Sequence, residues 1–172
     1  MKNIIILAFL ILATISVNAQ DSKKKSKKEL KAEKNARLAE ETKALVDSKT
    51  FVFDARTVNP MRGGTRTLTT QYEVRVENDS LFSYLPYFGR AYSVDYGSTE
   101  SPMTFDSPIV DYSSKEAKEG YTIKIKVKKG SDNMDYTFQV SETGSTVLSV
   151  NSTNRQAISY YGEIKKKEEK KK

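Results

Sequence analysis

The sequence predicts a mainly β protein, an antiparallel sandwich or barrel of about eight strands preceded by an N-terminal helix. Two observations carry this prediction. Many short segments alternate between apolar and polar side chains with a period of two, which is typical of strands with one buried face. The connections between these segments are also short, and short connections favour antiparallel pairing because parallel strands need a long crossover.

Residues 1–19 have the three parts of a secretory signal peptide. Lys2 gives a positive start, residues 4–12 form an apolar run, and residues 17–19 provide a small-residue cleavage site. We expect cleavage after Ala19 and an exported product that is soluble in the periplasm or outside the cell. The alternative is a membrane anchor, but the apolar run is shorter than the ~20 residues of a spanning helix. The chain has no cysteine, so a lipoprotein anchor and disulfides are both excluded.

A basic helical segment is predicted over residues 20–49. Ser26 and Glu29 have the spacing of a capping box, and neither glycine nor proline occurs before Pro60, so we expect a helix over about residues 27–46. Only its later half has a narrow apolar stripe, and this half should dock on the β body. The stripe consists of Leu38, Ala39, Thr42, Leu45 and Val46. The alternative is a charged linker with fluctuating helicity.

The antiparallel β domain is predicted over residues 50–164. Its clearest strand is 68–79, where Tyr72, Val74 and Val76 would face the core. Pro108 cannot donate to a ladder, so its segment should be a short or edge strand, followed by a polar loop over residues 113–120. The other strands are expected at residues 50–58, 81–85, 91–96, 103–112, 121–128, 134–140, 145–150 and 156–164.

The formal net charge is +7, but the positive charge is concentrated in two segments, residues 21–49 and 163–172. The intervening body is close to neutral and has no basic face that could follow a phosphate backbone, so nucleic acid is not an expected partner. We expect the helical segment and the basic tail, residues 165–172, to be solvated. The alternative is weak contact of these tails with anionic surfaces.

The absence of histidine and cysteine restricts the chemistry of this protein. Serine triads, cysteine nucleophiles and the usual zinc sites all require imidazole or thiolate groups. A carboxylate pair drawn from Asp95, Glu100, Asp106 and Asp111 is the remaining hydrolytic option. The stretch at residues 132–135 lacks the length and the glycine of a calcium loop. We therefore predict a non-enzymatic protein with no catalytic residues, no metal site and no cofactor.

The segment 81–92 departs from strict alternation and is rich in aromatic residues. Its phrase Leu-Pro-Tyr-Phe-Gly-Arg-Ala, residues 85–91, resembles that of an exported bacterial family known as domain of unknown function 4251 (DUF4251). Later positions that are similar are Phe105, Tyr121, Gly144, Arg155, Ile158, Tyr160 and Gly162. The resemblance covers about residues 30–164. It implies a signal and a charged helix before a β domain, and it carries no assigned activity, substrate or catalytic residue.

The same segment contains the candidate ligand-binding residues. These are Tyr84, Tyr87, Phe88, Arg90 and Tyr92. They could line a concave mouth in which rings stack on a sugar or a lipid and the guanidinium binds an anion. The structural alternative is that Pro86 ends a strand, Gly89 allows a turn, and the aromatic rings fill a corner of the core.

These features predict an exported binding or envelope-associated module whose partner is a small molecule, a glycan or an envelope protein. The alternative is a carrier that holds a lipid or a sugar inside its barrel, in the manner of lipocalins. An enclosed apolar cavity would favour the carrier. A filled interior with exposed aromatic residues would favour the module.

Overall fold

The computed structural model describes residues 26–92 and 101–167. The chain divides into two compact units, residues 1–34 and 35–172. In the first unit the structure describes the beginning of α2 (Lys27–Ser48). The Glu29 N–H donates to Ser26 Oγ at 3.2 Å, and the Ser26 N–H donates to Glu29 Oε2 at 2.8 Å. This reciprocal pair is the predicted capping box, whereas the predicted signal peptide lies outside the described residues.

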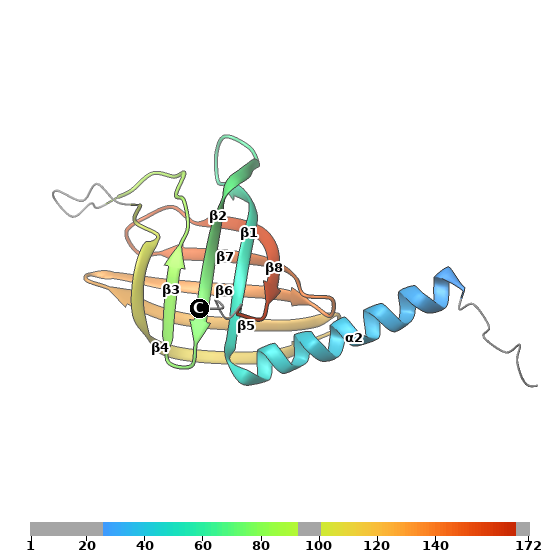
Figure 1. Ribbon diagram of the computed structural model, residues 1–172. Helices are drawn as coiled ribbons and strands as arrows, with labels where there is room; N and C mark the ends of the chain where they lie inside the picture. Colours follow the sequence, from blue (N-terminus) through green and yellow to red (C-terminus); the bar gives the residue numbers. More distant parts are fainter. Residues whose placement is uncertain (1–25, 93–100, 168–172) are drawn as a thin grey trace, which may run out of the picture. The chain divides into compact units, whose positions relative to one another are not determined.

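The second unit is a closed barrel of eight antiparallel strands in sequential order, in which β8 pairs with β1 (Figure 1). The mainly β, antiparallel prediction is confirmed, and of its two forms the barrel is correct. The strands are β1 (Thr50–Pro60), β2 (Arg66–Glu77), β3 (Ser80–Tyr84), β4 (Thr104–Ala117), β5 (Gly120–Lys129), β6 (Asp132–Ser141), β7 (Ser145–Ser152) and β8 (Ile158–Lys165).

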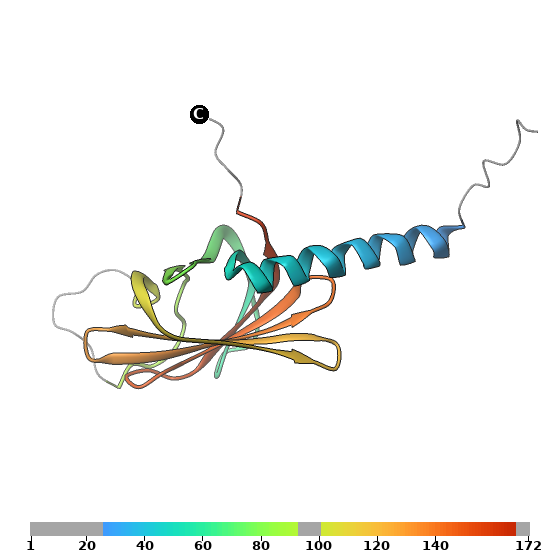
Figure 2. The ribbon, with the colours of Figure 1, turned by 90° about the horizontal axis from the view of Figure 1, so that it is seen from below.

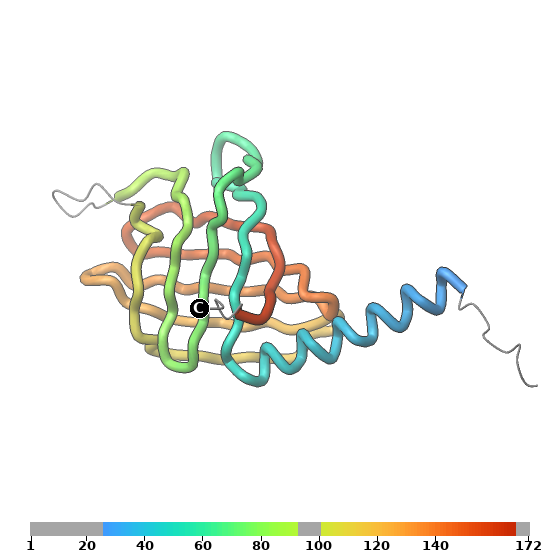
Figure 3. Tube along the Cα trace, in the orientation of Figure 1, coloured from blue at the N-terminus to red at the C-terminus, as the bar shows by residue number. Residues whose placement is uncertain are grey.

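The strands form two layers, because β1, β2 and β3 cross the direction of β5, β6 and β7 (Figures 1 and 2), while β8 pairs with β1 along its length. β4 belongs to both layers. Up to Pro108 it pairs with β3, and from Ile109 onward it pairs with β5. The Cα trace in Figure 3 shows β4 bending as it passes from one layer to the other.

The prediction of a short strand followed by a loop at 113–120 is therefore wrong, because β4 continues to Ala117, although each half of it pairs with a single neighbour. Pro108 lies at the corner where β4 changes its partner, and the register with β5 shifts just after it. Ser107 Oγ donates to the carbonyl of Lys128 on β5 at 3.1 Å. This hydroxyl provides a hydrogen-bond donor next to Pro108, which has no backbone N–H. β4 then continues as a regular strand to Ala117.

A strand predicted at residues 91–96 is not one of the barrel strands. Ala91 forms an isolated antiparallel bridge with Arg155, and residues 93–96 lie outside the described part of the chain. The bridge ties the segment after β3 to the connection between β7 and β8.

The interior of the barrel is filled by side chains. The rings of Phe51 and Phe53 pack edge-on against Phe138, with centroids 5.5 and 5.9 Å apart. Tyr136 and Tyr160 are fully buried beside them. Burial of such rings is a large apolar contribution to stability, at about 25 cal/mol per Å² of apolar surface.

The later half of α2 contributes to this core, as predicted. Thr42 and Val46 are buried, and Val46 belongs to the core cluster of the barrel. The hydroxyl of Tyr112 on β4 donates to the Val46 carbonyl at 3.4 Å. Burial raises the pKa of Tyr112 to about 12. Within residues 26–92 and 101–167, no helix combines the length and the apolar character needed to cross a membrane.

The two tyrosines of the core have partners for their hydroxyl groups. The Tyr136 hydroxyl donates to Ser83 Oγ at 3.2 Å, and Ser83 Oγ donates to the Met103 carbonyl at 2.7 Å. The Tyr160 hydroxyl donates to the Pro86 carbonyl at 2.8 Å. Burial raises the pKa of both tyrosines, so both are neutral hydrogen-bond donors at physiological pH.

Candidate functional site

The structure places the five residues predicted as a ligand-binding site in several local settings. Tyr84 ends β3 on the outer surface, with its ring centroid 5.3 Å from that of Tyr72 on β2. The ring of Phe88 lies 4.8 Å from the guanidinium carbon of Arg66. Tyr92 is 70% exposed. Each of these aromatic residues therefore has different surroundings.

Tyr87 and Arg90 are held by the connection between β7 and β8. The Tyr87 hydroxyl lies 3.0 Å from the carbonyl oxygens of both Arg90 and Gln156, to which it donates. Burial raises the Tyr87 pKa. The Arg90 N–H donates to Gln156 Oε1 at 3.3 Å, and the Arg90 carbonyl accepts the Gln156 N–H at 3.1 Å.

Gly89 has a steric role in this segment. A Cβ at this position would lie 2.4 Å from the Tyr87 hydroxyl oxygen, so a side chain would displace the ring of Tyr87. Together with the bond from Tyr160 to the Pro86 carbonyl, this close approach gives residues 85–91 a structural part in the barrel.

A buried carboxylate organises the neighbouring connection. Asp132, at the start of β6, is only 4% exposed and forms an ion pair with Arg155. The same carboxylate accepts hydrogen bonds from the hydroxyls of Ser152 and Thr153 and from the N–H groups of Thr153 and Asn154. The Asp132 network therefore fixes residues 152–155, and Gln156 follows directly.

Sequence reasoning did not find the Asp132 network. In the sequence, Asp132 belongs to a stretch too short for a calcium loop, and Arg155 is one of the positions similar to the DUF4251 family. Asp132 lies on β6 and Arg155 lies in the connection after β7. Because they belong to different segments, no residue spacing in the sequence indicates that they form an ion pair.

A broad outer groove of about 730 Å³ lies over the layer formed by β5 to β8, the twisted layer seen in Figure 2. One row of side chains crosses this layer, because Thr122 on β5 is opposite Gln139 on β6, and Gln139 is opposite Val147 on β7. Val147 in turn is opposite Tyr161 on β8. The turn between β4 and β5 forms one side of the groove through Ala117, Lys118 and Glu119.

The outer groove is mostly uncharged and offers hydroxyl and amide groups beside two aromatic residues, Tyr121 and Tyr161. Tyr161 is 43% exposed, so part of its surface is available to a ligand. Glu119 is the one carboxylate among the lining residues of this groove, which gives no pair for acid–base hydrolysis there. None of the five predicted site residues lines it.

The described residues outside the masked segments contain no group of three or more acidic side chains placed to hold a metal ion. Of the acids considered for hydrolysis, Asp106 and Asp111 are on β4. Asp95 and Glu100 lie outside the described residues.

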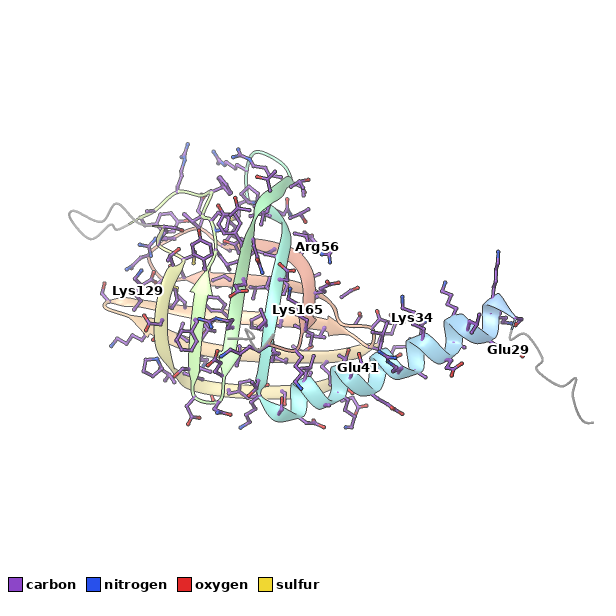
Figure 4. All side chains as sticks on the ribbon, viewed as in Figure 1. Glu29, Lys34, Glu41, Arg56, Lys129 and Lys165 are labelled. Atoms are coloured by element: carbon purple, nitrogen blue, oxygen red, sulfur yellow. The ribbon has the colours of Figure 1, made fainter. Side chains whose placement is uncertain are left out.

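Several cations of the barrel have structural partners. Arg56 pairs with Glu163 at 2.6 Å and Lys165 pairs with Asp54 at 3.1 Å, and both pairs join β1 to β8. Figure 4 labels Arg56, Lys165 and Lys129. Lys129 Nζ donates to the carbonyls of Pro102 and Thr104 and lies 5.1 Å from the centroid of the Phe105 ring.

Comparison with known proteins identifies the family of this chain. The chain is similar to a DUF4251 family protein from Bacteroides eggerthii DSM 20697, known from a crystal structure, with a TM-score of 0.56. The identity is 14%, and the match covers 75% of this chain and 87% of the other; at this identity the likeness concerns the fold alone. The chain matches no curated protein. The family model described as "Domain of unknown function (DUF4251)" matches residues 33–164, so the chain belongs to the DUF4251 family, as its sequence resemblance predicted.

Proposed function

We propose that this protein is an exported, non-enzymatic glycan-binding module and that the outer groove is its binding face. The main support is the contrast between the two places where a ligand could lie. The interior is occupied by rings such as Phe51, Phe138 and Tyr160. The outer groove is open, uncharged over most of its length and about 730 Å³ in volume, within the range of known ligand sites.

The groove combines apolar surface with neutral hydrogen-bonding groups, and this combination suits a sugar. The Tyr161 ring offers a flat apolar face to the C–H groups of a sugar, while its hydroxyl stays in water. Thr122, Gln139 and Ser145 offer neutral donors and acceptors for sugar hydroxyls. A lipid carrier would instead need an enclosed apolar space.

The signal-like residues 1–19 support export, which would bring the domain to the compartment of envelope and extracellular polysaccharides. The lack of histidine and cysteine and the single carboxylate in the groove support binding without turnover. In this proposal the basic helical segment and the basic tail remain in water and take no part in glycan binding.

The test is a binding survey of the mature protein against soluble polysaccharides, with the dissociation constant measured by calorimetry. Tyr161→Ala should weaken binding of the best glycan about tenfold, since a stacked ring is worth about 0.5–1.5 kcal/mol. Tyr84→Ala is the matched control, because Tyr84 is 47% exposed and Tyr161 is 43% exposed, on different parts of the barrel surface.

The control variant also tests the site predicted from the sequence. If Tyr84→Ala abolishes binding and Tyr161→Ala leaves it unchanged, the binding face is the segment 84–92 and the groove assignment fails. If no polysaccharide binds, the glycan-binding proposal itself fails. Urea unfolding of both variants establishes that each retains the fold.

A further inference from the structure

We infer that the glycan is acidic and that Lys115 and Lys124 hold its carboxylate or sulfate group; this inference rests on the proposed glycan-binding function. The evidence is the arrangement of four side chains on β4 and β5, the lack of an ion pair to either lysine within residues 26–92 and 101–167, and the continuity of this place with the outer groove.

The four side chains form a small square on the outer face. Ser113 on β4 is directly opposite Lys124 on β5, and Lys115 is directly opposite Thr122. The two lysines therefore occupy one diagonal and the two hydroxyls the other. Diagonal neighbours on a sheet have Cβ atoms about 7–8 Å apart, a span that two flexible ammonium groups can close around one anion. The four residues line a hollow of about 140 Å³.

Neither lysine of this square forms an ion pair with another described residue. Within residues 26–92 and 101–167, the salt bridges involve other cations: Arg37, Lys43, Arg56, Arg75, Arg155, Lys165 and Lys167. On β5, Lys124 is directly opposite Ser113 and Thr137, whereas Asp111 and Asp135 are only its diagonal neighbours. Lys124 lines a second hollow of about 350 Å³ with these two carboxylates, but neither forms an ion pair with it in the described residues. The two ammonium groups repel each other, and a bound anion would offset this repulsion.

The next lysine along β5 has a different setting. Lys126 is opposite Asp111 on one side and Asp135 on the other. Its charge is therefore balanced locally by neighbouring carboxylates, although none forms an ion pair with it in the described residues. This contrast makes Lys126 a natural control for the square.

The square is continuous with the outer groove. Thr122 lines both hollows, and it begins the row that ends at Tyr161. β5 and β8 are three strand spacings apart, or about 14 Å at ~4.8 Å per spacing. A ligand that reaches from Tyr161 to the lysines must therefore be longer than one sugar unit, which indicates an acidic oligosaccharide or polysaccharide.

Hydroxyl groups beside the ammonium groups also favour a sugar acid over an anionic membrane. The hollow is lined by two lysines, one serine and one threonine, and none of these residues can insert into the apolar layer of a bilayer. Serine and threonine hydroxyls can donate to carboxylate or sulfate oxygens and to the hydroxyls of the same sugar.

The experiment measures binding of the mature protein to polygalacturonate, dextran sulfate and neutral dextran by calorimetry at low ionic strength. The double variant Lys115→Gln/Lys124→Gln should weaken binding of the preferred acidic polymer roughly tenfold or more, since two exposed ionic contacts are lost. The matched double variant Lys126→Gln/Lys128→Gln removes the same charge from the same face of β5 and should change binding less than about twofold.

The two acidic polymers distinguish the chemical group, since a carboxylate site prefers polygalacturonate and a sulfate site prefers dextran sulfate. If both double variants lose the same amount of affinity, the acidic polymer is attracted to positive charge in general. That result would overturn the inference. Binding of neutral dextran with equal or greater affinity, lost in Tyr161→Ala, would overturn the acidic ligand while supporting the proposed function. Binding of no polysaccharide, or of phosphatidylglycerol vesicles alone, would overturn both.

Discussion

Removal of the Asp132 carboxylate should be among the most damaging changes to this barrel. The side chain of Asp132 is 5% exposed and that of Arg155 is 12% exposed. In Asp132→Ala the guanidinium of Arg155 remains partly buried without its counter-charge, and breaking a buried ion pair in this way costs about 3–5 kcal/mol. The N–H groups of Thr153 and Asn154 also lose one of their two acceptors, but each keeps another, the Asn133 carbonyl for Thr153 and Ser152 Oγ for Asn154, so this loss adds little.

These costs overlap, because water that enters the space left by the carboxylate would partly satisfy several donors at once. We therefore expect the free energy of unfolding to fall by about 3–5 kcal/mol in total. Asp132→Asn keeps an acceptor oxygen for the backbone but loses the charge facing Arg155. Its cost should be intermediate, at about 1.5–3 kcal/mol.

The assay is urea unfolding followed by far-ultraviolet circular dichroism and by tyrosine fluorescence, since the chain has ten tyrosines and no tryptophan. Asp135→Ala is the matched control, because Asp135 is an exposed aspartate on the same strand. It should change stability by no more than about 0.5 kcal/mol. Equal midpoints for Asp132→Ala and Asp135→Ala would refute the reasoning.

The same variant should loosen a distant part of the sequence. The Asp132 network holds the connection that leads to Gln156, and Gln156 pairs with the backbone of Arg90. In Asp132→Ala, the hydrogen-exchange rate of the Arg90 amide should therefore rise. The rise should be larger than the one calculated from the fall in the free energy of global unfolding. Unchanged local protection would mean that residues 90–92 are held independently.

Three further changes test the barrel. Gly162→Ala places a Cβ 1.9 Å from a backbone carbonyl oxygen of β1, so the free energy of unfolding should fall by about 3 kcal/mol or more; a normal urea midpoint would contradict this close approach. Burial raises the pKa of Tyr136 and Tyr160, so their contribution to stability is intact below the unfolded pKa of about 10 and is lost as pH rises further, at up to ~1.4 kcal/mol per pH unit for each. Tyr136→Phe should reduce this alkaline slope of the unfolding free energy, and an unchanged slope would argue against the assignment. Ser107→Ala should cost about 1–3 kcal/mol, because the carbonyl of Lys128 loses its donor; a urea midpoint equal to that of the unmodified protein would show that the hydroxyl is dispensable.

Most of the strands could be predicted from local patterns. In β2, the inward series Tyr72, Val74 and Val76 is separated by exposed or half-exposed polar residues, so the buried face is visible in the sequence. The beginning of α2 could be predicted because Ser26 and Glu29 bond each other within one turn. In both cases the interacting groups are close in the chain.

The errors arose where distant partners decide the structure. A proline normally indicates an edge, but Pro108 is tolerated within the barrel because β4 changes neighbours there and Ser107 donates to a carbonyl of β5. The polar residues 113–117 resemble a loop by composition, yet they pair with β5 throughout. Hydrogen bonding to a neighbouring strand does not depend on side-chain polarity.

The candidate binding surface could not be predicted for a related reason. The row from Thr122 to Tyr161 joins four strands, and which outward residues share a row depends on the register of every pair. The aromatic residues at 84–92, by contrast, are adjacent in the chain, so their grouping is visible in the sequence.

The sequence by itself determined the antiparallel β class, the start of the helix and the exclusion of imidazole and thiolate chemistry, because composition, side-chain alternation and capping are properties of residues near one another. Only the tertiary structure decided that β8 closes on β1, that Asp132 meets Arg155, and that Lys115 and Lys124 line one hollow. These features depend on contacts between residues far apart in the chain, whose register is set by how the filled core packs.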